Sequence, residues 1–148
     1  MEKIILLVPL IPLLSALLTQ LLFPRMGRQA ARISVIGSLL TFLFAVATLW
    51  LVLAVPGSYG VHLFDTSALL LLDPLSSLMA TVIAGISLIV HIYSLRYMAE
   101  ETGYARFFIL LDLMTTSLLV MVAAGDLLTL LVAWHLIGVL LYFLLGQN

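Results

Sequence analysis

Long apolar stretches that carry almost no charge dominate this chain of 148 residues. Hydrophobic residues make up 64% of it and charged residues 9%, whereas soluble domains are about 45–50% apolar and about 25% charged. A soluble domain of this size cannot bury so much apolar surface. A transmembrane helix needs about 20 apolar residues to cross a bilayer, and five stretches are long enough: 4–23, 33–55, 74–95, 107–125 and 127–146. We therefore expect a multi-pass integral membrane protein of a bacterial or organellar inner membrane.

The fold class is expected to be all-α. Isolated strands cannot cross lipid because their backbone polar groups stay unpaired, and the stretches lack the strict alternation of membrane-barrel strands. We expect five transmembrane helices in a single membrane domain over residues 1–148. The formal net charge of −1 provides no basic surface for nucleic acid. Since the chain has no cysteine, it offers no thiolate for a disulfide or a metal, and no cofactor, metal ion or catalytic chemistry is expected on it.

The basic residues predict the orientation of the helices. Five of the six Lys and Arg residues lie between the first and second stretches or between the third and fourth: Arg25, Arg28, Arg32, Arg96 and Arg106. These two connections share one side of the membrane if every stretch crosses it. Because basic residues concentrate in cytoplasmic connections, the N-terminus is expected outside and the Arg-bearing side is expected to be cytoplasmic or its organellar equivalent.

The one long connection, residues 56–73, is then expected outside. Val61, Leu63 and the apolar run 69–72 predict a short hairpin that lies on the helix bundle.

Two acidic residues mark the starts of helices. Asp73 precedes Pro74, and Asp126 precedes the fifth stretch. An Asp side chain accepts hydrogen bonds from the free N–H groups of the first turn, and Pro at the first helical position loses no hydrogen bond. Pro9 and Pro12 are expected in the first turns of the first helix, where a missing N–H costs least.

The second half of the chain carries a series of short motifs in a fixed order. They read LDPLS at 72–76, HIYS at 91–94, GYARFF at 103–108, GDLL at 125–128 and WHLIG at 134–138, followed by Tyr142 and LLG at 144–146. In this order and spacing they resemble the N-terminal part of the antiporter-like chain 5 of respiratory complex I. Relatives of that chain occur in photosynthetic complex I, membrane-bound hydrogenases, Mrp-type sodium/proton antiporters and inorganic-carbon uptake systems. The resemblance implies a helical subunit of an ion-translocating complex.

Two departures from this family stand out. In the family the residue after the tryptophan of the fifth helix is usually Glu, a central carboxylate of the proton path, whereas His135 follows Trp134 here. The family chain also continues through many more helices, including a broken helix whose lysine partners the Glu and a second inverted repeat. The resemblance therefore implies an N-terminal fragment or a split subunit, whose helix bundle other membrane subunits complete.

Three ionisable side chains lie inside the predicted helices: His91, Asp112 and His135. Such residues are costly in lipid when unpaired and usually mark a functional path. His135 lies near the middle of the fifth stretch and shares a helical face with Gly138 and Tyr142. Because imidazole titrates at about pH 6.5, His135 and Tyr142 are candidates for a proton path. A histidine that only bonds between helices and never titrates is the alternative, and both stay open.

Asp112 and His91 are expected at similar depth, since they lie at comparable distances from one connection at about 1.5 Å of rise per residue. Thr115 and Thr116 extend a polar stripe from Asp112 along the fourth helix. One interpretation is a proton path that opens toward the cytoplasmic side. The other is a buried pair that fixes helix packing, which the resemblance favours because the family usually has an uncharged polar residue near the Asp112 position.

Three functions fit these observations. The first is a membrane subunit of a proton- or cation-translocating, antiporter-like complex, where the chain serves an NADH:quinone oxidoreductase-like enzyme without performing its catalysis. The second is a structural or assembly subunit with no ion path of its own. The third is the membrane component of an ion-gradient-driven bicarbonate or CO2 uptake system, with a soluble zinc partner expected on the cytoplasmic side. The histidine at the usual Glu position shifts weight toward such divergent members.

Overall fold

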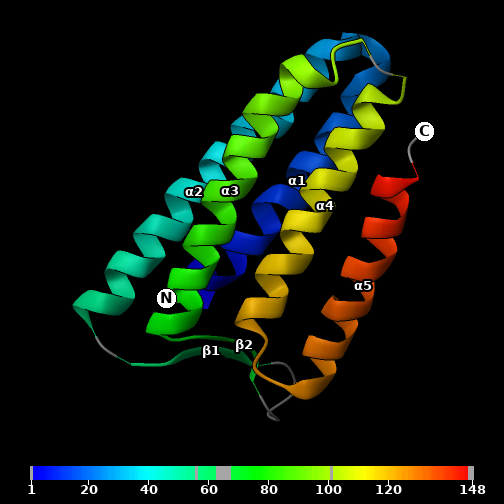
Figure 1. Ribbon diagram of the computed structural model, residues 1–148. Coiled ribbons are helices and arrows are strands. Elements are labelled where there is room, and N and C mark those ends of the chain that lie inside the picture. The colour runs from blue at the N-terminus through cyan, green and yellow to red at the C-terminus, as the bar shows by residue number, and fades with distance from the viewer. Residues whose placement is uncertain (1, 56, 63–67, 101, 147–148) are drawn as a thin grey trace.

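The structure, a computed structural model, describes residues 2–55, 57–62, 68–100 and 102–146. Its elements in chain order are α1 (Glu2–Met26), the 3-10 turn η1 (Gly27–Ala30), α2 (Ala31–Ala54), β1 (Tyr59–His62), β2 (Ala68–Leu72), α3 (Pro74–Tyr97), α4 (Tyr104–Ala123) and α5 (Leu127–Leu145). Consecutive helices run antiparallel, and the two strands lie across one end of the bundle (Figure 1). The predicted α-helical fold is confirmed.

Four helical segments in the described part of the chain are long and apolar enough to cross a membrane: Ile4–Ala54, Pro74–Tyr97, Tyr104–Ala123 and Leu127–Leu145. The protein is therefore a multi-pass integral membrane protein, as predicted. The first segment has 51 residues, far more than the about 20 that one crossing needs, and it contains α1, η1 and α2. The number of crossings and the orientation of the N-terminus stay predictions.

The predicted helix caps of α3 and α5 are confirmed. The carboxylate of Asp73 accepts a 2.7 Å hydrogen bond from the Ser76 backbone N–H, and the Ser76 hydroxyl oxygen accepts one of 2.9 Å from the Asp73 N–H. Pro74 takes the first helical position. Asp126 accepts a 2.6 Å hydrogen bond from the Thr129 backbone N–H. The bonds between Asp73 and Ser76 are reciprocal, and both caps satisfy N–H groups that the helix itself cannot pair.

The expected position of the first prolines is wrong. Helix α1 already begins at Glu2, so Pro9 and Pro12 lie in its interior, together with Pro24. Each removes one backbone hydrogen bond of the helix. Such prolines are tolerated in membrane helices because neighbouring helices re-satisfy the freed groups.

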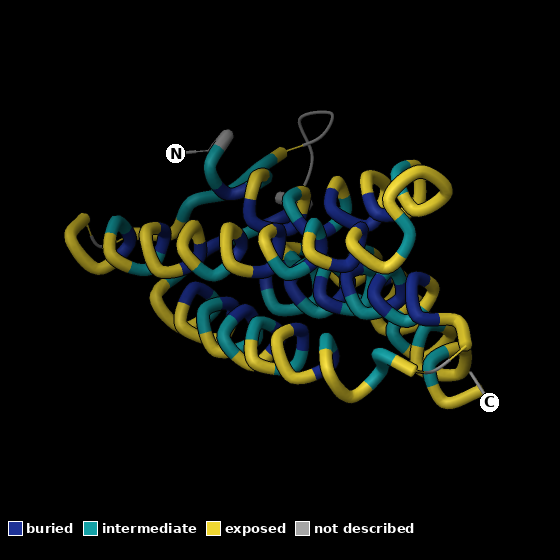
Figure 2. The backbone as a smooth tube through the Cα atoms, turned by 90° about the horizontal axis from the view of Figure 1, so that it is seen from above, coloured by how far each residue is buried: buried dark blue, intermediate teal, exposed yellow. Residues whose placement is uncertain are grey.

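Small side chains allow the helices to approach one another. Ala45 of α2 and Ala84 of α3 are 1% and 0% exposed, and they pack with Val8 of α1 and Leu119 of α4 in one apolar cluster. Since lipid is as apolar as leucine, close contact between small residues is what favours helix association in a bilayer. Burial is concentrated where α1 to α4 face one another (Figure 2). Helix α5 packs mainly on α4, and its only buried described residue is Ala133.

The predicted hairpin is confirmed for its described residues. Strands β1 and β2 pair antiparallel, with Tyr59 opposite Leu72. Leu70 and Leu72 alternate into the core, where they pack with Ile5 of α1 and Ala123 of α4. Leu63, also expected in the hairpin, lies outside the described residues. The hairpin thus covers one end of the bundle.

Candidate functional site

A buried pair of ionisable side chains joins α3 to α4. His91 and Asp112 are both 0% exposed, and His91 Nε2 lies 3.0 Å from Asp112 Oδ1. The partnership predicted from their similar depth is therefore confirmed, whereas a role for the pair in ion movement stays a prediction. Among the described residues this is the one contact within salt-bridge distance.

Two serines from the first helical pair complete the environment of the carboxyl group. The hydroxyls of Ser34 in α2 and Ser15 in α1 donate to Asp112 Oδ2 at 2.7 and 3.1 Å. Four helices therefore meet at one carboxyl group, and both of its oxygens have partners. In a medium without water, each such bond offsets the cost of burying a polar atom, which reaches several kcal/mol when it is left unpaired.

Neither serine is among the predicted site residues, because those were sought on helices that carry an ionisable side chain, and stretches 4–23 and 33–55 carry none. A signal was present in α2. Its buried positions include Ser34, Gly37, Ser38, Thr41 and Ala45, which recur at the spacing of one helical face. A stripe of small and hydroxyl residues in an apolar helix is typical of an interface with other helices.

A chain of hydrogen bonds leads from the far side of the His91 ring to α4. His91 Nδ1 lies 2.7 Å from the Ser87 carbonyl oxygen and 3.2 Å from the Ser87 hydroxyl. The Ser87 hydroxyl lies 2.7 Å from that of Thr115, which donates to the Leu111 carbonyl oxygen at 2.9 Å. The predicted site residue Thr115 thus belongs to the buried cluster. The hydroxyl of Thr116 instead donates to the Asp112 carbonyl oxygen at 3.1 Å, outside the cluster.

The surroundings of the pair are otherwise apolar. The Phe108 ring lies 6.1 Å from the His91 ring, centroid to centroid, and is fully buried. Within the described ranges no three His, Cys, Asp or Glu side chains gather where they could hold a metal ion. Chemically, the cluster can bind, hold or pass on a proton.

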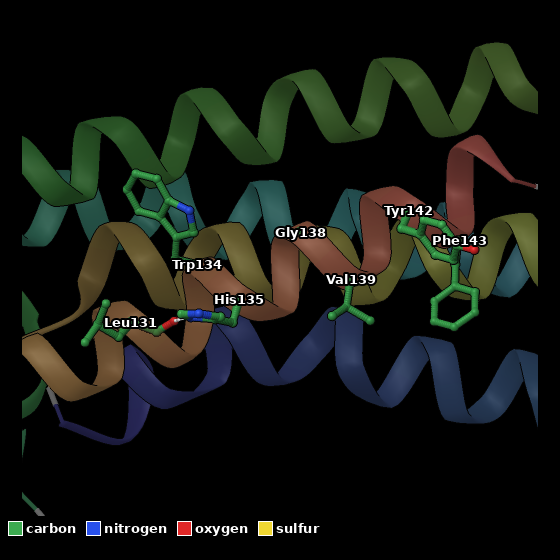
Figure 3. Close-up of a pocket in the computed structure, with 7 residues that line it drawn as sticks. All are labelled: Leu131, Trp134, His135, Gly138, Val139, Tyr142 and Phe143. Atoms are coloured by element: carbon green, nitrogen blue, oxygen red, sulfur yellow. Dashed lines mark hydrogen bonds between the residues drawn. The ribbon is translucent and has the colours of Figure 1, made fainter.

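His135 and Tyr142 lie elsewhere. Both are on the exposed face of α5, and they share a groove with Leu131, Gly138 and Val139 (Figure 3). The shared face expected from their spacing is therefore confirmed. His135 Nδ1 lies 2.7 Å from the Leu131 carbonyl oxygen. The structure does not bring His135 or Tyr142 to the buried pair, so the candidate residues form two separate groups.

Comparison with known proteins agrees with the motifs. Residues 60–108 match the family model of the NADH-ubiquinone oxidoreductase (complex I) chain 5 N-terminus. The chain is related to complex I chain 5. The matched segment contains all but the first residue of β1, then β2, α3 and the start of α4, and so includes His91 but not Asp112.

The relatives carry two kinds of name. The chain is 58% identical over 143 residues, or 96% of its length, to a probable inorganic carbon transporter subunit DabB1 of Halothiobacillus neapolitanus, of which it covers 26%. It is 29% identical to the NADH-quinone oxidoreductase subunit L of Neisseria meningitidis, with 95% of the chain and 23% of the relative covered. It is 30% identical to the F(420)H(2) dehydrogenase subunit L of Methanosarcina mazei, with 99% and 22% covered. The chain thus spans about a quarter of the length of these relatives, all of which are named as subunits.

Proposed function

We propose that this chain is part of the membrane component of an inorganic-carbon uptake system, in which an ion gradient drives the uptake of bicarbonate or CO2. The observation that carries the proposal is the 58% identity to the inorganic carbon transporter subunit over 96% of the chain. This is about twice the 29% and 30% identity to the two oxidoreductase subunits over a similar share of the chain.

Gradient-driven uptake needs an ion path through the membrane component. The buried cluster around His91, Asp112 and Thr115 supplies ionisable and hydroxyl groups inside the bundle, where such groups are retained mainly for function. His135 and Tyr142 on α5 are a second set of candidates, and Thr116 of α4 lines a pocket with Val132 and Leu136 of α5. A soluble partner on the Arg-bearing side completes the proposed system.

We further propose five membrane crossings with the N-terminus outside. The antiparallel order of α1 to α5 in Figure 1 supports this arrangement, as does the grouping of five of the six basic residues in two connections. Most of α5 is exposed, and we propose that helices of other membrane segments cover its groove. The bilayer surrounds the rest.

The test is uptake of labelled bicarbonate by cells that lack their own inorganic-carbon transporters and express the complete complex containing this chain. We expect accumulation that stops when an ionophore collapses the ion gradient. The proposal would be refuted if bicarbonate accumulation were unchanged by the ionophore, or if an assembled complex accumulated no bicarbonate.

The second candidate is a subunit of a proton-translocating NADH:quinone oxidoreductase-like complex, which the family model favours. It predicts that the purified complex oxidises NADH with quinone and pumps protons. A purified complex without any redox partner subunit, yet active in bicarbonate uptake, would exclude this candidate.

A further inference from the structure

The hydrogen bonds around His91 restrict where its protons can be. Its Nδ1 lies 2.7 Å from the Ser87 carbonyl oxygen. A carbonyl oxygen can only accept a hydrogen bond, so Nδ1 carries a proton. The position of the second proton then depends on the contact of Nε2 with Asp112.

That contact requires one further proton. Nε2 lies 3.0 Å from Asp112 Oδ1. Without a proton between them, the lone pair of a neutral imidazole would face a negatively charged oxygen, which is repulsive. The other carboxyl oxygen, Oδ2, accepts from Ser34 at 2.7 Å and from Ser15 at 3.1 Å. The exchangeable proton therefore lies between Nε2 and Oδ1.

We propose that His91 and Asp112 form a binding site for a single proton, which the two side chains share between Nε2 and Oδ1. When the proton moves, the Oδ1–H bond of the acid breaks as the Nε2–H bond forms, which turns a neutral pair into an imidazolium and a carboxylate. In both forms the pair is neutral overall. Neutrality is what a buried site in a bilayer favours, because a net charge there is expensive.

The helices around the pair supply no competing charge. The side chains that face it are Ser15 from α1, Ser34 from α2, Ser87 from α3, and Phe108 and Thr115 from α4. None of them is charged near neutral pH. The proton count of the site is therefore set by His91 and Asp112 alone among the described residues.

The same contacts disfavour a sodium ion. Hard cations bind oxygen ligands, but Oδ1 faces a ring nitrogen, and the hydroxyl hydrogens of Ser15 and Ser34 point at Oδ2. A cation at this carboxyl group would have to displace the imidazole and rotate both hydroxyls. The geometry thus assigns the site to a proton. The assignment itself does not depend on the proposed function, but the transport measurement that tests it does.

The decisive variant is Asp112→Asn. An asparagine of the same shape can donate from its amide nitrogen to a neutral His91 Nε2 and accept the two serine hydroxyls on its oxygen. The hydrogen bonds to His91 and to the two serines are then kept without an exchangeable proton, and only the second amide hydrogen of the asparagine gains no partner among the described residues. We therefore expect the complex still to assemble, with a small decrease in its unfolding temperature, while ion uptake into vesicles driven by a proton gradient falls at least tenfold. Asp73→Asn, the same substitution at a carboxyl group outside the spans, should transport like the wild type.

Three outcomes would overturn the proposal. The first is normal proton-driven uptake by Asp112→Asn. The second is uptake by the wild-type complex that is driven by a sodium gradient and does not respond to a pH gradient. The third needs no variant: nuclear magnetic resonance of the wild-type complex with 15N-labelled histidine should show His91 Nδ1 protonated at every pH at which the complex is folded, and a deprotonated Nδ1 would contradict the assignment. If the wild type takes up protons and Asp112→Asn does not, but no inorganic carbon accumulates, the proposed function is wrong and the proton site is supported.

Discussion

His135 lies on the exposed face of α5, with its Nδ1 2.7 Å from the Leu131 carbonyl oxygen. Nδ1 therefore carries the proton of the neutral ring, and Nε2 becomes the nitrogen that could meet another group. In the part of the chain that the structure describes, no hydrogen bond to Nε2 occurs. A role in transport for this histidine accordingly depends on a helix that covers the groove of α5.

Two substitutions of His135 distinguish a proton relay, in which the ring gains and loses a proton during transport, from a packing role. Gln keeps hydrogen bonding but does not titrate, so a relay predicts that His135→Gln abolishes ion transport by an assembled complex. His135→Glu introduces the carboxylate that the family resemblance implies at this position, and it should retain part of the activity. We expect this ranking, with proton uptake in vesicles measured per assembled complex.

A packing role predicts the reverse. Gln would then be nearly silent, and Glu would harm assembly because an unpaired carboxylate in the membrane centre costs several kcal/mol. Normal transport by His135→Gln would end the relay hypothesis for this residue.

Residue patterns revealed only part of the buried site. The depth of His91 and Asp112 in adjacent helices was enough to predict their contact. The partners on α1 and α2 could not be assigned, because hydroxyl residues are common in membrane helices and bond to their own backbone as readily as across an interface. Thr19, for example, donates to the Ser15 carbonyl oxygen at 2.8 Å. Which serine faces the carboxyl group is decided by helix rotation, and the sequence alone does not fix that rotation.

At the scale of elements, the close approach of α1 to α2 depends on Gly37. A Cβ atom at this position would lie 2.5 Å from the Ser15 hydroxyl oxygen and 2.6 Å from its Cβ. Those atoms belong to the short side chain that donates to Asp112, so it has little freedom to move aside.

Gly37→Ala should therefore destabilise the protein. Overpacking of this kind costs about 1–3 kcal/mol, and we expect a lower unfolding temperature of the detergent-solubilised protein. Gly138→Ala is the matched control, since a Cβ there meets nothing within 4 Å in the described structure. Equal stability of Gly37→Ala and the wild type would show that α1 and α2 are less closely packed than described. A Gly138→Ala variant that folds but fails to assemble would indicate a partner helix at the groove.

The N-cap of α3 predicts a dependence on pH. The backbone N–H of Ser76 holds the pKa of Asp73 below its ordinary value of 3.8. A carboxyl group whose pKa is lowered on folding stabilises the folded state above its ordinary pKa, and this contribution is lost as the pH falls through the lowered value. Asp73→Ala should cost about 1 kcal/mol at neutral pH, and less at a pH below the lowered pKa. A cost that does not change with pH, measured by thermal unfolding in detergent, would contradict the role of the charged cap.

The caps show which parts of an element are encoded locally. Asp73, Pro74 and Asp126 act through backbone groups within three residues, so their positions in the sequence were sufficient to predict the starts of α3 and α5. The start of α1 was not predictable in this way. Its interior prolines would by themselves favour a later start, and they are tolerated because neighbouring helices re-satisfy the freed backbone groups.

At the scale of the whole molecule, five of the six basic residues gather at the end of the bundle opposite the hairpin. Arg28 lies over the Tyr104 ring at 5.5 Å, and Arg106 lies over the Phe143 ring at 5.7 Å. These contacts tie η1 to the start of α4 and α4 to the end of α5. A charged end held in place by aromatic rings suits the boundary between lipid and water, where aromatic and basic side chains concentrate.

The orientation of this end is open to a direct measurement. The chain contains no cysteine, so single cysteines can be introduced into it at exposed positions. Ser58 lies beside the hairpin, whereas Gln29 in η1 and Thr102 before α4 lie at the Arg-bearing end, and all three are exposed.

If the helices α1 to α5 each cross the membrane with the N-terminus outside, a membrane-impermeant thiol reagent added to intact cells should label a cysteine at Ser58. Cysteines at Gln29 and Thr102 should label only after the membrane is permeabilised. Because α2 lies between Gln29 and Ser58, and α3 between Ser58 and Thr102, labelling from opposite sides tests the crossing of these two helices. Labelling of Ser58 and Gln29 from the same side would refute the arrangement.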